Sequence, residues 1–306
     1  MGFPEFYHPD RVGKMVEPEV AAAIEEGLHA GYAPAAQDVS RRLLLLVDEQ
    51  VDFVHPDGAL SVPGAVQDTR RLIEWLFRHT GEITQITASL DSHLPVHVFY
   101  PTWWVDEHGG HPAPYTAITQ QDVETSRWRP VYEEQWSLEY VRRLQEQARK
   151  DLMIWPYHTM IGTQGHAITP ALYEAIAYHS AARQSKPEFL VKGTIAKTEF
   201  YSIFEPEVKV GDDPAGNMNK PFLQSLAKFD QVYIAGQAKS HCVLETVQSL
   251  MRHFGDQKQM LERMHLLMDC TSSVQHPEVD FEALAQEALL GFEKQGLNLV
   301  TTTDPL

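Results

Sequence analysis

The sequence is short of cysteine, of long apolar runs and of basic charge, and each shortage excludes a class of protein. Its 306 residues include only two cysteines, Cys242 and Cys270, too few for the disulfide framework of a small secreted domain. The longest aliphatic block, residues 43–47, is far shorter than a membrane span. Residues 1–10 lack a basic region followed by an apolar one, so no secretory signal peptide is expected. Together these features predict a cytoplasmic protein.

Basic residues are outnumbered along the whole chain. There are 25 Lys and Arg against 42 Asp and Glu, which gives a formal net charge of −17. A surface of this sign repels both phosphate backbones and anionic lipid. We therefore expect a small molecule as the partner, rather than a nucleic acid or a membrane.

What the chain does contain is an alternation of apolar strands and amphipathic helices. Strands are expected near residues 42–48, 82–90, 188–192, 231–236, 265–270 and 297–302. Helices are expected near 17–28, 68–79, 137–148 (capped by Ser137), 169–183, 221–229, 242–254 and 279–295. This order predicts an α/β fold, a doubly wound and mostly parallel six-stranded sheet with helices on both faces.

Two segments fall outside the alternation. Residues 1–39, punctuated by prolines, are interpreted as an N-terminal extension to a domain that spans residues 40–306. Within that domain an insertion occupies about 94–150, and its irregular, aromatic-rich part is 94–136. Loops this long are usually lids, binding elements or disordered. We expect both segments to cover the mouth of a site or to build a subunit interface, and therefore a homo-oligomer.

A cysteine follows the strand expected at 231–236. Cys242 comes after a short polar turn and opens the next helix, where the partial positive charge of the first turn favours a thiolate. Free backbone N–H groups at such a turn can also hold an oxyanion. The pattern indicates a nucleophile, and the alternative is a small buried packing residue.

Other reactive side chains also follow strands. Asp48 follows the first strand, and Lys192 ends the strand expected at 188–192. Ligands of open α/β sheets bind beyond the carboxyl ends of the strands, so both should lie near Cys242. Asp48 can take the proton of the thiol, and Lys192 can stabilise the thiolate. A helix cap and a surface lysine are the alternative interpretations of these two residues.

Asp91 and His93, after the second strand, form a plausible pair of metal ligands. Carboxylate oxygen and imidazole nitrogen suit zinc, iron or manganese. The third ligand must come from elsewhere, and His158 is the candidate. Its rivals are His97, which is also considered as an extra ligand, His108, His111 and His166.

The motifs resemble those of the nicotinamidases within the isochorismatase-like cysteine hydrolases. LLLLVDEQVDF is similar to the family's opening strand, which places its catalytic aspartate at Asp48, and GALSVPGA (58–65) resembles the stretch after it. LDSH resembles the metal motif of Asp91 and His93, and WPYHTMIGTQG resembles the segment with a further ligand, His158.

The second half of the chain continues the resemblance. FLVKG and GQAKSHCV are similar to the segments that carry the catalytic Lys192 and Cys242, and the blocks run in the family's order from about residue 42 to 302. The resemblance implies that Phe53 and Trp155 flank a flat aromatic ring. It also implies an oxyanion hole made by the N–H groups of Ala238 and Cys242, beside a cis peptide at Gln237–Ala238.

The activity that the resemblance implies is a cysteine-dependent amidohydrolase. It would release ammonia through a thioester intermediate, with nicotinamide as the best-guess substrate and one divalent transition metal, zinc first. Lys239 and Ser240 replace the family's usual threonine and acid, and the cation could favour a carboxylated amide. Another amide or carbamoyl substrate, the vinyl ether of isochorismate, and a non-enzymatic binding module are the alternatives.

Overall fold

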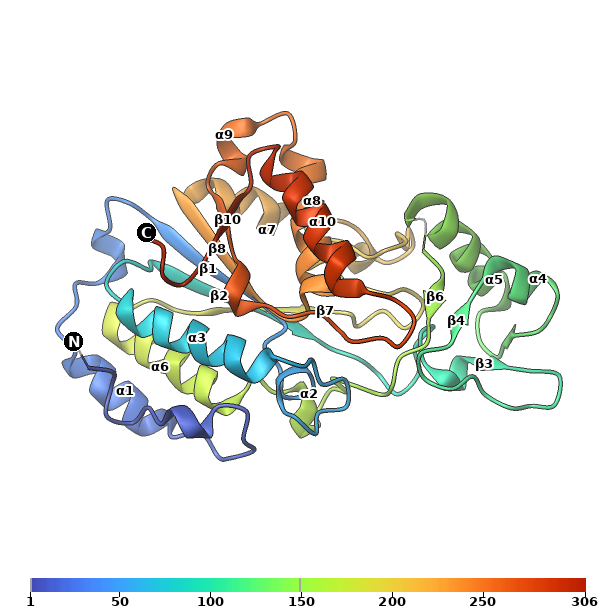
Figure 1. The fold of residues 1–306 in the computed structure, drawn as a ribbon, viewed down its shortest axis with the longest axis horizontal. Coiled ribbons are helices and arrows are strands. Elements are labelled where there is room, and N and C mark those ends of the chain that lie inside the picture. The colour runs from blue at the N-terminus through green and yellow to red at the C-terminus, as the bar shows by residue number, and fades with distance from the viewer. Residues whose placement is uncertain (1, 149) are drawn as a thin grey trace.

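A computed structural model describes residues 2–148 and 150–306 (Figure 1). Met1 of the N-terminal extension and Arg149 of the insertion lie outside the described residues. In the described part, six parallel strands form one sheet in the order β10-β9-β8-β1-β2-β7. These strands are β1 (Arg42–Val47), β2 (Gln85–Asp91), β7 (Glu188–Lys192), β8 (Gln231–Gly236), β9 (Met264–Leu267) and β10 (Asn298–Val300). The predicted fold class is confirmed.

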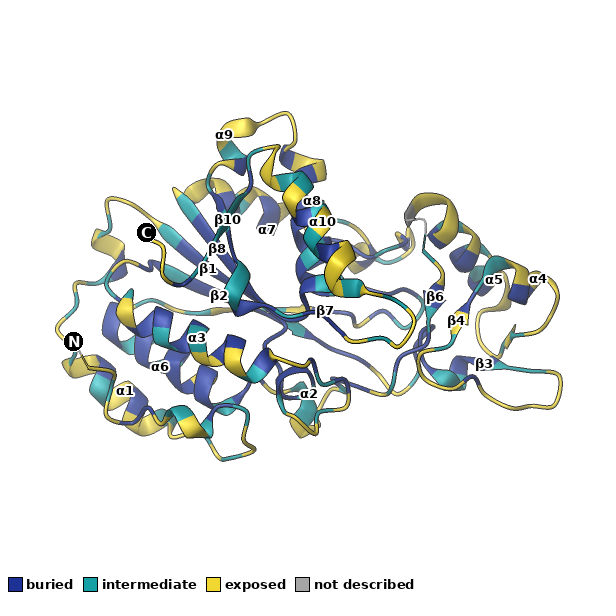
Figure 2. Ribbon diagram, in the orientation of Figure 1, coloured by how far each residue is buried: buried dark blue, intermediate teal, exposed yellow. Residues whose placement is uncertain are grey.

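Helices cover both faces of this sheet. On one face lie α3 (Ala65–Arg78) and α6 (Pro170–Arg183), with α1 (Val20–His29) packed outside α6; on the other lie α7 (Lys220–Ser225), α8 (Leu244–Phe254) and α10 (Phe281–Glu293) (Figure 1). Two single turns, α2 (Val51–Val54) and α9 (Lys258–Leu261), complete this part. Figure 2 shows the sheet buried between the layers.

The leucines of β1 explain why both faces are covered. Leu44 and Leu46 face the core with α3 and α6, whereas Leu43 and Leu45 face the core with α8. All four are 0% exposed, as expected for a central strand of a parallel sheet. From β1 the chain builds outward through β2 to β7, and it then returns to the other side of β1 through β8. This change of direction sets a topological switch point at the carboxyl ends of β1 and β8.

The insertion forms its own lobe at one end of the sheet (Figure 1). Two short antiparallel pairs join β3 (Trp104–Val105) to β5 (Arg129–Pro130) and β4 (Ala117–Ile118) to β6 (Leu152–Met153), with α4 (Gln120–Glu124) and α5 (Glu134–Arg143) alongside. The predicted cap at Ser137 is wrong, because α5 begins at Glu134. The Ser137 hydroxyl instead donates to the carbonyl of Tyr132 and accepts from the Trp103 indole.

The N-terminal segment packs on the sheet's helical layer. Gly27 of α1 lies so close to α6 that a Cβ there would be 2.5 Å from the carbonyl oxygen of Tyr178. Phe6 and Tyr7 pack against Phe77 of α3. A subunit interface at this segment, and a homo-oligomer, remain predictions. No helix among the described residues has the length and apolar character needed to cross a membrane.

Candidate active site

Three strand ends bring Asp48, Lys192 and Cys242 together in a buried cluster. The Lys192 ammonium, at the end of β7, lies 2.9 Å from Asp48 Oδ2 and 3.7 Å from Cys242 Sγ. It also donates to Asp91 Oδ1 at 2.8 Å and to the carbonyl of Phe200 at 2.6 Å. All three side chains are at most 6% exposed. One buried cation therefore contacts two carboxylates and the thiol.

The position of Cys242 differs from the simple helix start that the sequence suggests. It lies inside a π-helical turn, Lys239–Val243, which precedes α8. Burial raises the pKa of the Cys242 thiol well above its usual value, and the Lys192 charge opposes this only in part. The expectation that the helix start alone favours the thiolate is therefore wrong here, since desolvation outweighs it. The thiol needs a base.

Asp48 is placed to be that base. Burial raises its pKa, with Lys192 acting in the opposite direction and Asp91 in the same direction. A carboxylate with a raised pKa is the stronger proton acceptor. Ser89 Oγ donates to Asp48 Oδ1 at 2.5 Å and fixes its orientation. For Lys192, burial lowers the pKa, but Asp48 and Asp91 together raise it well above the usual value, so the lysine carries its charge.

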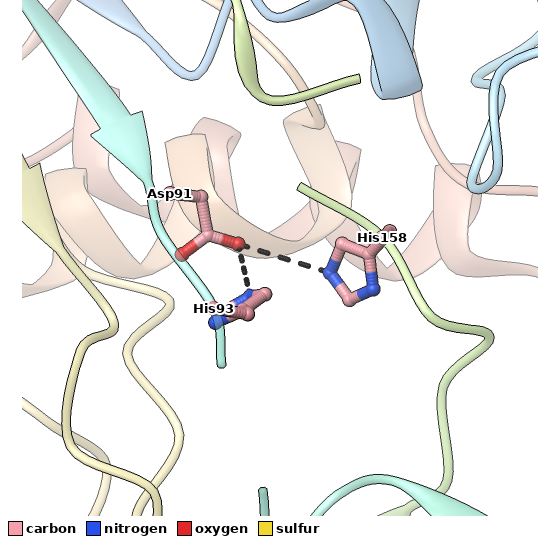
Figure 3. A group of neighbouring side chains, drawn as sticks. All are labelled: Asp91, His93 and His158. Carbon is pink, nitrogen blue, oxygen red and sulfur yellow. Dashed lines mark ion pairs between the residues drawn. The ribbon is translucent and has the colours of Figure 1, made fainter. Parts of the chain in front are cut away.

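Asp91, His93 and His158 converge beside this cluster (Figure 3). Asp91 Oδ2 lies 2.7 Å from His93 Nε2 and 3.8 Å from His158 Nε2. Each histidine turns its other nitrogen to a backbone carbonyl, His93 Nδ1 to Gly193 at 3.2 Å and His158 Nδ1 to Pro156 at 2.7 Å. That arrangement leaves both Nε2 atoms aimed at the carboxylate, and metal-ligating histidines are commonly oriented by a backbone carbonyl in this way.

The donor set fits a transition metal. His93 Nε2 is buried without a well-oriented hydrogen-bond partner, although it lies beside Asp91. An oxygen and two imidazole nitrogens suit zinc, with iron or manganese as alternatives. In the part of the chain that the structure describes, this is the one such group of three.

The rival histidines are engaged elsewhere. His97 Nε2 accepts from the N–H of Leu94 at 3.0 Å, and His166 Nε2 contacts Ser92 Oγ at 2.7 Å. His111 Nδ1 contacts the carbonyl of Trp104, and His108 is exposed. None of them joins the three candidate ligands among the described residues.

The turn after β8 carries a free N–H group. The Ala238 N–H makes no hydrogen bond within the described residues, and Ala238 lines the cavity at Cys242. Gln237–Ala238 is a cis peptide, as the resemblance implied. Gly236 has φ of 125°, and a Cβ there would lie 2.0 Å from the carbonyl oxygen of Val47, so only glycine fits.

The cavity itself is small, about 20 Å³. That is room for about one water molecule. Phe53 and Trp155 both line it, as the resemblance implied. The residues that complete its lining are Leu60, Asp91, His158, Glu199, Tyr201, Ala238, His241 and Cys242. A substrate can enter only if some of these side chains move.

Besides Leu60, three lining residues were not predicted from the sequence. Glu199 is buried, and burial raises its pKa to about 7. The Tyr201 hydroxyl accepts from the Trp155 indole at 3.0 Å. His241 packs edge-on against Trp155, with ring centroids 5.3 Å apart, and burial lowers its pKa to about 3. The adjacency of His241 to Cys242 was the available signal for one of them.

The insertion reaches this region through aromatic contacts, and the N-terminal segment does not. The ring of Tyr115 lies 6.0 Å from Trp155, and that of Phe99 lies 4.8 Å from His93. None of residues 2–39 lines the cavity. Lys239 also points away, because its ammonium pairs with Glu282 of α10 at 2.6 Å. This pairing removes the reason for expecting a carboxylated amide.

Several solved structures have a fold similar to that of this chain. An Acinetobacter baumanii nicotinamidase/pyrazinamidase has a TM-score of 0.58 at 18% identity, covering 88% of this chain and 100% of its own. The yeast nicotinamidase bound to the inhibitor nicotinaldehyde has a TM-score of 0.56 at 17% identity, covering 85% and 99%. An L. infantum protein in complex with nicotinate has a TM-score of 0.51 at 18% identity, covering 87% and 95%. No protein-family model and no curated protein matches the sequence. The fold expected from the motifs is therefore shown.

Proposed function

We propose that this chain is a cysteine-dependent amidohydrolase that releases ammonia from a small aromatic amide. One observation carries the proposal: the Lys192 ammonium contacts Asp48, Asp91 and Cys242 inside a buried site next to the free N–H of Ala238. A nucleophile, a base, a fixed cation and an oxyanion donor are the parts that acyl transfer requires.

In the first half-reaction, Asp48 takes the proton of Cys242 and the thiolate attacks the amide carbon. The carbonyl oxygen becomes an oxyanion that accepts from the N–H groups of Ala238 and Cys242. Asp48 then gives its proton to the amide nitrogen, the C–N bond breaks, and ammonia leaves. The acyl group remains on Cys242 as a thioester. Lys192 keeps its charge throughout and stabilises both anionic partners.

In the second half-reaction, water replaces ammonia. Asp48 removes a proton from the water as its oxygen attacks the thioester carbon, and the same two N–H groups hold the oxyanion. The C–S bond breaks and Asp48 returns the proton to the sulfur. The products are the carboxylic acid and the free thiol, so one amide and one water give one acid and one ammonia.

A divalent transition metal held by Asp91, His93 and His158 would supply a Lewis acid beside the ring slot, able to ligate a pyridine nitrogen or a water. Phe53 and Trp155 line the same slot and favour a flat aromatic substrate. Nicotinamide combines a flat ring, a pyridine nitrogen and an amide, and the inhibitor and ligand in two similar structures share that ring. It is the substrate that we propose first.

Ammonia release from nicotinamide and from benzamide, measured side by side, tests this assignment. Benzamide has the same shape but lacks the ring nitrogen, so nicotinamide should be hydrolysed distinctly faster. Asp91→Ala should reduce both the overall rate and the preference. Equal rates would remove the metal from recognition, and no ammonia from any amide would refute the amidase.

Two alternatives are left for experiment to decide. The fold and the cluster around Lys192 would serve another amide or a carbamoyl group equally well, which a screen over such substrates would detect. A non-enzymatic binding module is the second, in which the same pocket would hold a ligand without turning it over. Binding of nicotinate without turnover of any amide would establish that reading.

A further inference from the structure

A second buried polar cluster lies directly behind the active site. It consists of Glu49, Asp68, Thr69 and Gln237, all at most 2% exposed, and we call it the Glu49 cluster. Thr69 Oγ1 donates to Glu49 Oε2 at 2.7 Å, and Gln237 Nε2 donates to Asp68 Oδ2 at 3.3 Å. None of the four lines the cavity, and the reaction described above uses none of them.

The cluster is connected to the catalytic groups through the backbone. Glu49 directly follows Asp48, and Gln237 directly precedes Ala238. The Gln237 N–H donates to the carbonyl of Val47 at 2.8 Å, and its side-chain Oε1 accepts from the N–H of Ser272 at 3.3 Å. Three hydrogen bonds therefore fix Gln237 to β1, to α3 and to the segment after β9.

We infer that the Glu49 cluster positions the oxyanion hole: Gln237, held by Asp68 beside Glu49, orients the adjacent Ala238 N–H toward the reacting carbonyl. The inference rests on the proposed function and deepens it. Gln237 and Asp68 are positioning residues, because neither touches the substrate.

Physical chemistry explains why such a device needs to be polar. Apolar side chains at these positions would pack without a preferred direction, whereas a hydrogen-bonded amide has a defined orientation. Donors at an oxyanion hole act at distances of about 2.7–3.1 Å, so a small rotation of the turn is enough to lose their effect. The free Ala238 N–H has no other partner among the described residues to hold it in place.

The cluster is stable without a buried cation because Glu49 keeps its proton. Burial raises the pKa of Glu49 to about 8, hydrogen bonds from Thr69 and Gln237 oppose the rise, and Asp68 adds to it. The one cation at the edge, Arg71, donates to Asp68 Oδ1 at 2.6 Å and is 42% exposed. The amide of Gln237 thus lies between a neutral carboxyl and a carboxylate.

The test uses a pair of variants at Asp68. Asp68→Ala removes the acceptor for Gln237, whereas Asp68→Asn loses the charge that pairs with Arg71 but keeps an acceptor of the same shape. We expect Asp68→Ala to lower kcat by about 10- to 100-fold with KM within about threefold, in line with the loss of one oxyanion donor. Asp68→Asn should stay within about threefold of wild type. Gln237→Leu should behave as Asp68→Ala does.

A second readout separates positioning from general destabilisation. Nicotinaldehyde adds to a thiolate to give a tetrahedral hemithioacetal, whose oxygen occupies the oxyanion hole, whereas nicotinate forms no such adduct. Asp68→Ala and Gln237→Leu should lower the affinity for nicotinaldehyde by the same factor as they lower kcat. Both should leave the affinity for nicotinate unchanged. Leu72→Ala, in the core of α3, is the matched control: it should lower stability while kcat of the folded protein stays near wild type.

The outcomes distinguish the two claims. If wild type releases ammonia but Asp68→Ala and Gln237→Leu lose no more kcat or aldehyde affinity than Leu72→Ala, the inference is wrong and the proposed function stands. Equal losses in Asp68→Ala and Asp68→Asn would also overturn it, because the ion pair with Arg71 would then be responsible. Wild type that neither turns over amides nor binds nicotinaldehyde would overturn both.

Discussion

Two pairs of buried carboxyl groups meet at the end of β1, and they are neutralised in different ways. Asp48 and Asp91 share the Lys192 ammonium at 2.9 and 2.8 Å. Glu49 and Asp68 share no buried cation among the described residues, and burial raises the pKa of Glu49 to about 8, so it remains protonated at neutral pH. The adjacent residues Asp48 and Glu49 thus belong to two different clusters, one held by a buried cation and one in which a buried carboxyl group keeps its proton.

The difference indicates what each cluster can do. A cluster held by a fixed charge can gain and lose a proton at Asp48 while Lys192 keeps the site polar, which suits chemistry. In the Glu49 cluster, Glu49 holds its proton and Asp68 pairs with Arg71 at the surface, so its hydrogen bonds define geometry instead. Removing the Lys192 cation should therefore destabilise the chain, whereas making Glu49 unable to ionise should stabilise the chain as the pH rises.

Lys192→Met should have the largest effect. It leaves Asp48 and Asp91 buried without their cation, which typically costs about 3–5 kcal/mol, and it should also abolish turnover. Denaturant unfolding together with ammonia release measures both losses. Lys197→Met, which removes a partly exposed pair with Asp212, is the control and should cost at most about 1 kcal/mol. A stable, active Lys192→Met protein would refute the ionic cluster.

Metal removal should affect turnover strongly and the Glu49 cluster little. We expect elemental analysis to find about one transition metal ion per chain in the wild type. His158→Ala should lose this metal, and its activity should fall by at least about tenfold. His166→Ala is matched, because it removes a histidine near the site that contacts Ser92 rather than the three ligands. Metal-free protein with full activity after chelation would contradict the metal site.

Glu49→Gln should have a smaller effect that depends on pH. Between the pKa of Glu49 in the unfolded chain, near its ordinary value of 4.5, and the folded value of about 8, the folded chain binds more protons than the unfolded one. The contribution of Glu49 to stability therefore falls as pH rises through this window. Glutamine cannot ionise, so the advantage of Glu49→Gln over wild type should grow from pH 4.5 to pH 8.

Unfolding free energies of the two proteins across that window measure the effect. The charged groups that face Glu49, namely Asp48 and Asp68, are present in both proteins, as is Arg71 beside Asp68. Their contributions largely cancel in the difference. A constant difference between pH 4.5 and pH 8 would show that Glu49 is not held protonated.

Cys270→Ser should have the smallest effect on activity. Cys270 is 0% exposed in the core beneath α3, and burial raises its thiol pKa far above the usual range. Cys270 is not among the residues that line the cavity, and its sulfur lies 4.0 Å from Asp269 Oδ1. Steady-state rates within about twofold of wild type are expected, and a large loss would place Cys270 in the catalytic apparatus.

The sequence was sufficient for the fold and for the strand-end residues. The apolar run of β1 and the polar residue that follows it are local features, so Asp48 could be placed at the carboxyl end of a central strand from the pattern alone. The same holds for Lys192 and for the pair Asp91 and His93. Parallel strands then bring these residues together, because the carboxyl ends of all the strands lie on the same side of the sheet.

The remaining features depend on packing that the sequence does not encode locally. Glu199 and Tyr201 enter the cavity from an irregular loop whose path is set by distant contacts. Lys239 has the partner Glu282, 43 residues further along the chain, so its charge could not be judged from its neighbours. The raised pKa of Cys242 follows from burial, which a helix-start argument leaves out.

The central claim is that Cys242 carries an acyl group during amide hydrolysis, and rapid acid quenching tests it most directly. Wild-type protein mixed with nicotinamide, quenched during the first turnover and digested, should yield a Cys242 peptide heavier by one nicotinoyl group, with an equal amount of ammonia. Cys242→Ala should give neither the adduct nor ammonia above background. Ammonia released without any acylated Cys242 peptide, and at an undiminished rate by Cys242→Ala, would contradict the account.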